Sequence, residues 1–290
     1  MRCTILLLVS FFSFLFSAHS QDENAWLDIE VQLVAYSESL KSAPNDDERR
    51  VWDDSLRQTV RKLLDLSGSM TASFPNVKWM GILDAPDGMV RIYSWNIPWS
   101  DQSNTYRCFI QYKESKKSDN IWWVELNDTV RDDENITQKV MTPERWQGAL
   151  YYSIIPVQDN RKPYYILLGW DGRDMITNRK VIEVLTLSKD KVRLGAPVFR
   201  VEKGSPKRFM LDYGEDRSVS LRYNEKQKRI IFDHLAPSHP SLAGNPAFYG
   251  SDLTFDAFLL KNGEWIFESN IDITLGKDDI KQPYIDPRNN

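Results

Sequence analysis

Residues 89–95 read Met-Val-Arg-Ile-Tyr-Ser-Trp, and this stretch decides the fold class. Its side chains alternate between two faces, which is the period-two pattern of a half-buried β-strand. Pro86-Asp87-Gly88 comes directly before it and has the composition of a tight turn. A strand that follows a turn in this way predicts an antiparallel hairpin.

The same pattern continues almost to the end of the chain, separated by turn residues and with no helical periodicity between the strands. The strands that it predicts cover residues 106–112, 121–126, 148–156, 164–170, 180–187, 207–213, 219–223, 229–234, 254–260 and 265–271. Lys261-Asn262-Gly263 resembles a two-residue hairpin turn. The fold class is therefore mainly β. It is an antiparallel β-sandwich or open barrel, or a small propeller-like meander, because strand groups recur at roughly fifty-residue spacing. The groups share no repeated motif, which favours the sandwich or barrel.

The segment before the strands has a different period. Two apolar stripes recur there at steps of three and four residues, as on one face of a helix. The stripes are Trp26, Ile29, Leu33, Tyr36 and Leu40, then Trp52, Leu56, Val60, Leu63 and Leu64. Pro44-Asn45-Asp46-Asp47 separates them. We expect an N-terminal helical hairpin over residues 21–72 that packs on a β domain of residues 73–275, because an isolated pair of short helices is marginal in water.

The first twenty residues have the layout of a cleavable secretory signal. Arg2 supplies a positive start, residues 5–16 are almost wholly apolar, and Ala18-His19-Ser20 places small residues before Gln21. The apolar run is too short to span a bilayer of roughly 30 Å. We therefore expect an exported protein, periplasmic or secreted, that begins at Gln21 and ends in a loosely ordered tail over residues 276–290.

Composition narrows the possible partners. The chain carries 37 Lys and Arg against 41 Asp and Glu, a net charge of −4. A nucleic-acid partner normally requires a basic surface, so none is expected, and no transmembrane segment is expected in the mature chain. Cys3 leaves with the signal, and Cys108 then has no internal disulfide partner. It is expected to be a buried strand residue, and the absence of disulfides favours a bacterial source.

One loop concentrates polar groups between two strongly apolar strands. Two carboxylates, two guanidinium groups, an amide and an aromatic ring fall within ten residues. They are Trp170, Asp171, Arg173, Asp174, Asn178 and Arg179. The carboxylates of Asp171 and Asp174 could coordinate a hard cation, although they do not match the calcium-loop spacing of an EF-hand. The arginines could instead bind a carboxylate or phosphate. The alternative is a hairpin turn whose charges pair with one another. This loop is the predicted ligand site.

Asp233 and His234 are the second pair of interest, because imidazole titrates near neutral pH. Neighbours in a strand point to opposite faces, so these two side chains are not expected to bond each other. The sequence has no strained Gly-x-Ser-x-Gly elbow to supply a nucleophile. With two histidines and one cysteine in the mature chain, no metal site and no cofactor are expected.

Several of these segments resemble a group of uncharacterised secreted proteins of Gram-negative bacteria. The segments are residues 87–95, 168–172, 178–183 and 231–235. The resemblance implies export and brings no activity with it. The leading prediction is a non-catalytic binding or structural module, with a glycan or another envelope component as its possible partner. The alternative is a hydrolase of glycan or cell-envelope polymer that uses paired carboxylates near Asp171 and Asp233.

Overall fold

The computed structural model describes five stretches of the chain, residues 26–118, 120–130, 133–158, 162–189 and 191–272. The predicted leader and the predicted tail lie outside these residues. The chain divides into two compact units, one ending at Trp79 and one beginning at Met80. The boundary falls close to the predicted one at residue 73. Each unit is described by itself.

The first unit contains the predicted helical hairpin. Residues 26–42 are helical, and α2 spans Asp46–Leu64. Asn45 caps α2, since its side chain accepts a hydrogen bond from the Glu48 backbone N–H, and the acidic first turn suits the positive end of the helix dipole. The rings of Tyr36 and Trp52 stack between the helices with their centroids 5.9 Å apart. The hairpin is confirmed, whereas its packing on the β domain stays a prediction.

The second unit begins with a four-stranded antiparallel sheet, the first sheet. Its strands are β1 (Gly81–Asp84), β2 (Val90–Pro98), β3 (Asn104–Lys113) and β4 (Ile121–Asn127), in that order. Gly88, with φ of 70°, turns the chain between β1 and β2 as its sequence predicts. Cys108 is fully buried in β3, which confirms the expectation, and burial raises the pKa of its thiol well above the ordinary value.

The middle sheet is also antiparallel. Its strands are β5 (Leu150–Val157), β6 (Tyr164–Asp171), β7 (Thr177–Ser188) and β10 (Phe209–Gly214), with the short strand β8 (Lys191–Leu194) beside the end of β7. The connection into this sheet carries the short 3-10 helix η1 (Ile136–Gln138).

The third sheet contains the last strands of the chain. They are β11 (Leu221–Asn224), β12 (Arg229–Pro237), β13 (Tyr249–Lys261) and β14 (Glu264–Glu268), with the two-residue strand β9 (Phe199–Arg200) parallel to β14. Two 3-10 helices, η2 (Pro240–Leu242) and η3 (Pro246–Phe248), join β12 to β13. Asn262 and Gly263 both have positive φ, so the predicted two-residue turn is present.

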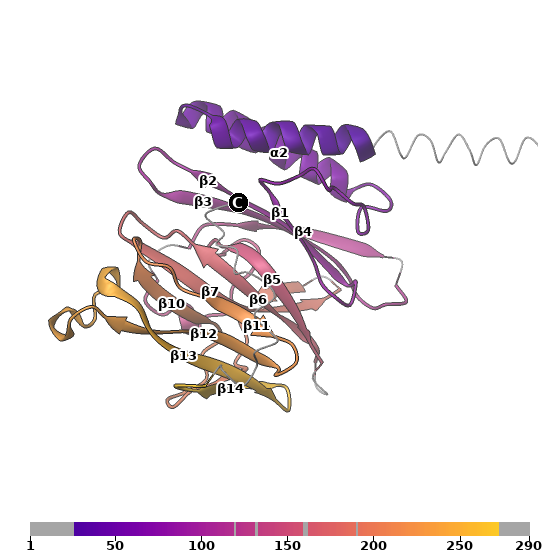
Figure 1. Cartoon of the computed structure of the whole chain (residues 1–290). Coiled ribbons are helices and arrows are strands. Elements are labelled where there is room, and N and C mark those ends of the chain that lie inside the picture. The colour runs from indigo at the N-terminus through magenta and orange to yellow at the C-terminus, as the bar shows by residue number, and fades with distance from the viewer. Residues whose placement is uncertain (1–25, 119, 131–132, 159–161, 190, 273–290) are drawn as a thin grey trace, which may run out of the picture. The chain divides into compact units, whose positions relative to one another are not determined.

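The three sheets stack as layers, and the middle sheet is buried on both faces (Figure 1). In β6, Tyr165 and Leu167 pack into one hydrophobic cluster with the first sheet, whereas Ile166 and Leu168 pack into the other with the third sheet. The prediction of a mainly β, sandwich-type fold is confirmed, and no sheet closes into a barrel among the described residues. The third layer is a finding that the sequence analysis did not include.

Candidate functional site

The predicted site loop joins β6 to β7, and its charges pair with one another. The strand register places Asp171, Arg179 and Asp212 side by side on β6, β7 and β10. The Asp212 carboxylate accepts hydrogen bonds from Nε and Nη2 of Arg179 and, at 2.9 Å, from Nη1 of Arg173. We call Arg173, Arg179 and Asp212 the outer arginine cluster. Sequence reasoning missed Asp212 because it lies 33 residues from Arg179.

Asp174 fixes the shape of the same loop. Its Oδ1 accepts the backbone N–H groups of Ile176 at 2.9 Å and Thr177 at 2.7 Å. Burial works to raise the pKa of Asp174, but these hydrogen bonds outweigh it, so the pKa lies below its ordinary value. The carboxylate therefore stays ionised and holds the turn.

Trp170 and Asn178 are buried beneath the loop. The Trp170 side chain is only 7% exposed, which leaves no open ring face for a ligand to stack on. Asn178 Nδ2 donates to the Glu215 carbonyl at 3.3 Å, and the Glu215 N–H donates to the Ile176 carbonyl at 3.0 Å. The β6–β7 loop is thus attached to the turn after β10.

Asp233 and His234 make separate contacts, as the alternation of strand residues predicts. Asp233 Oδ2 accepts the Ser220 N–H at 3.0 Å, whereas His234 Nδ1 lies 2.8 Å from Oδ2 of the buried Asp256. The hydrogen bond with Asp256 raises the pKa of His234 above its ordinary value. Burial raises the pKa of Asp233.

His234 lies opposite a bulge in β13. Asp233 pairs with Phe255 and Leu235 with Ser251, so one residue of β12 faces three of β13, residues 252–254. Asp252 holds the bulge by accepting the Thr254 N–H and hydroxyl. Leu253 at its tip has a φ of 73°, a region that leucine rarely adopts.

Contacts between neighbouring loops of the second unit link the two predicted site segments, and we call these loops the loop surface (residues 172–176, 214–217, 246–248 and 252–254). Gly214 packs so closely on the Ala247 carbonyl that a Cβ would lie 2.6 Å from its oxygen. Gly250 packs on the Arg217 side chain, next to the bulge. The backbone N–H and carbonyl of Glu215 bond Ile176 and Asn178, which links the turn after β10 to the β6–β7 loop.

Four large apolar side chains project from the loop surface into solvent. Met175 is 61% exposed, Ile176 62%, Phe248 41% and Leu253 86%. In the described part of the second unit the other exposed large apolar residues are Trp122 and Val140. Sequence reasoning overlooked these four because it examined polar groups alone. The signal that could have found them is an apolar pair, Met175-Ile176, at a hairpin tip that normally carries polar residues.

A second arginine cluster lies deep in the molecule. Arg208 and Glu183 are fully buried and bond through Arg208 Nε and Glu183 Oε2 at 2.8 Å. The remaining donors of Arg208 bond the carbonyls of Ile136, Lys139 and Leu194. Burial raises the pKa of Glu183, and Arg208 opposes that shift. We call this pair the inner arginine cluster.

Among the described residues, no group of three or more His, Cys, Asp and Glu side chains is arranged to hold a metal ion. No helix in the same part of the chain is long and apolar enough to cross a membrane. Comparison with models of protein families, with curated proteins and with solved structures finds no match to this chain.

Proposed function

We propose that this chain is an exported, non-catalytic binding module that docks a protein partner through the loop surface. The observation that carries the proposal is that four large apolar side chains are exposed on loops that contact one another. Exposed apolar side chains that gather on one part of a protein surface mark interaction sites. Loops on a sheet scaffold are a usual place for such sites.

The loops that carry these side chains are held at their bases. Asp174 closes the turn under Met175 and Ile176, and Asn245 caps η3 beside Phe248. The outer arginine cluster joins the β6–β7 loop to β10. A surface fixed in this way loses little conformational entropy on binding, which favours affinity.

Charge indicates the kind of partner. The loop surface carries four exposed carboxylates, whereas Arg217 is its exposed arginine and pairs with Asp216. The carboxylates belong to Asp174, Glu215, Asp216 and Asp252. A protein surface with apolar side chains and a basic rim is complementary to this arrangement. A glycan is less well matched, because Trp170 is buried.

The rival hydrolase has less support. Asp171 and Asp233 are both buried, and they belong to different sheets. Paired catalytic carboxylates must reach the same glycosidic bond from positions accessible to the sugar. The binding module is therefore the better proposal.

Export is part of the proposal and rests on the sequence of residues 1–20, which lie outside the described residues. Mass spectrometry of the secreted or periplasmic fraction tests it. A mature protein that begins at Gln21 is expected. A retained leader or a lipid-modified N-terminus would contradict the proposal.

Docking is tested with a fluorescent amphipathic peptide of Lys and Leu, and with its Glu and Leu counterpart. Fluorescence anisotropy should show preference for the basic peptide. The variant with Met175, Ile176, Phe248 and Leu253 all changed to Ser should bind it about tenfold more weakly, a loss near 1.4 kcal/mol. Val140→Ser, a change at an exposed apolar residue elsewhere, is the control and should bind normally. Equal binding of both peptides would refute the docking proposal. Normal binding of the basic peptide by the variant with four substitutions would refute it as well.

A further inference from the structure

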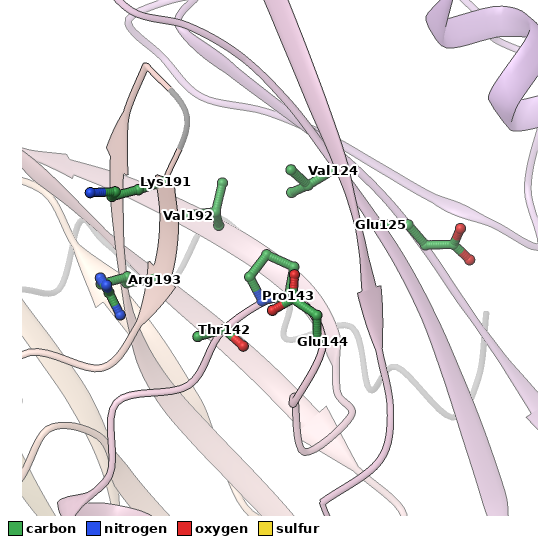
Figure 2. Close-up of a pocket in the computed structure, with 8 residues that line it drawn as sticks. All are labelled: Val124, Glu125, Thr142, Pro143, Glu144, Lys191, Val192 and Arg193. Atoms are coloured by element: carbon green, nitrogen blue, oxygen red, sulfur yellow. The ribbon is translucent and has the colours of Figure 1, made fainter.

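A hollow of about 410 Å³ lies where the edge of the first sheet faces the short strand β8 (Figure 2). Val124 of β4 and Val192 of β8 point toward each other across it, and Pro143 lies at its floor. Lys191 and Arg193 point away from the space and are exposed. The inner face of β8 is thus apolar and its outer face is cationic.

The backbone of β8 presents hydrogen-bonding groups along its free edge, which borders this hollow. Leu194 and Met141 exchange two hydrogen bonds, Met141 N–H to the Leu194 carbonyl at 2.7 Å and Leu194 N–H to the Met141 carbonyl at 3.0 Å. This places the polar groups of Leu194 on the edge away from β7. Because these groups alternate along an antiparallel strand, the N–H and C=O of Val192 face the same edge, and those of Lys191 and Arg193 face β7.

The protein's own chain begins a ladder on this edge and then leaves it. After the Met141–Leu194 bridge, Pro143 turns to the first sheet, where its carbonyl accepts the Asn127 N–H at 2.7 Å. In the described part of the chain, β7 is the strand that pairs with β8, and no segment continues the ladder past Leu194. The free edge of β8 beside Val192 borders the hollow.

We propose that β8 binds an extended peptide as an added antiparallel strand, with an apolar residue opposite Val192 and acidic residues opposite Lys191 and Arg193. Strand addition at a sheet edge takes its affinity from main-chain hydrogen bonds and its specificity from alternate side chains. Opposite charges in facing positions add to the stability of such pairs. This site is separate from the loop surface, so the proposal does not depend on the one made above.

Glu144 limits the charge that the peptide can carry at its N-terminal end. It is exposed near the floor beside Pro143, and a hydrogen bond from the Thr142 hydroxyl lowers the pKa of its carboxyl. An acidic residue at the peptide's N-terminal end would meet this carboxylate. The matched probe is therefore acetyl-Glu-Val-Glu-amide, whose neutral acetyl cap lies at that end and leaves Leu194 bonded to Met141.

The test measures amide hydrogen exchange of the full mature chain by NMR, with and without this peptide. The peptide is used at about 5 mM, a concentration suited to a weak ligand. Exchange at the Val192 amide should slow at least threefold. The same peptide with its valine nitrogen methylated loses a backbone donor and should give no protection. Unchanged exchange at Val192 with the unmodified peptide would overturn the proposal.

Charge reversal gives the second arm. The variant Lys191→Glu/Arg193→Glu should lose binding of the acidic probe and gain binding of acetyl-Lys-Val-Lys-amide. Lys203→Glu/Lys261→Glu changes the net charge equally at exposed lysines elsewhere and should behave as the wild type. If both double variants bind the acidic probe equally weakly, the probe responds to the net charge of the protein and the β8 site is refuted.

Discussion

Two arginine clusters use similar chemistry in different surroundings. The inner cluster, Arg208 with Glu183, is fully buried. Arg208 also donates hydrogen bonds to one carbonyl of η1, one just after η1 and one of β8. The outer cluster, Arg173 and Arg179 with Asp212, is partly exposed beside the loop surface. This difference indicates that the role of an ion pair depends on which segments it joins and on how exposed it is to solvent. The inner cluster holds the fold together, and the outer one positions a surface.

The largest effect is expected at the inner cluster. Arg208→Met leaves Glu183 as an uncompensated buried carboxylate and removes donors from three carbonyl groups. The free energy of unfolding, measured by urea denaturation, should fall by about 3–5 kcal/mol. Adding Glu183→Gln should recover part of that loss. A single variant within 1 kcal/mol of the wild type would show that the inner cluster does not hold the fold, since buried pairs that lose one partner cost more.

A smaller effect is expected at the outer cluster, because solvent screens its charges. Asp212→Asn should lower the free energy of unfolding by about 1 kcal/mol or less. It should also speed hydrogen exchange at the Ile176 and Thr177 amides, since the β6–β7 loop loses one of its attachments to β10. If Asp212→Asn is as damaging as Arg208→Met, the distinction between the clusters fails.

How much of this the sequence could predict depends on the distance over which each feature is built. Strand periodicity and the Asn262-Gly263 turn are local, and they predicted the strands well. The third layer was missed although residues 164–170 form a nearly continuous apolar run, as expected of a strand buried on both faces. Short strands such as β8 and β9 were missed because they have few residues to show a period.

The candidate site was predictable only in part. The polar residues near Arg179 were visible, but their partner Asp212 comes from a strand that is distant in sequence. The same holds for His234 and Asp256, which the register of β12 and β13 brings together. A sequence shows which groups are present but does not show which of them neutralise one another. Whether the predicted residues contact a ligand stays a prediction.

The His234–Asp256 pair predicts a modest dependence of stability on pH. The pKa of His234 is raised in the folded protein, so the contribution of the pair is complete below the unfolded pKa, about 6.5. It disappears as pH rises through the higher folded pKa. His234→Gln should therefore lower the melting temperature more at pH 5.5 than at pH 8.5. Because the imidazole is partly exposed, the loss should be a few tenths of a kcal/mol. The opposite trend would show that Asp256 does not stabilise the imidazolium.

Leu253 tests the central claim, that the loop surface binds a partner, more directly than any other residue. Its backbone has a φ of 73° and its side chain is 86% exposed, so it strains the bulge without filling the core. Leu253→Asn suits that conformation and should leave stability unchanged or raise it by roughly 0.5 kcal/mol. The measurement is the affinity of Leu253→Asn for the Lys and Leu peptide, with urea denaturation beside it. The account predicts weaker binding, about threefold, at equal or higher stability. Unchanged affinity, or a stability loss above about 1 kcal/mol, would contradict it.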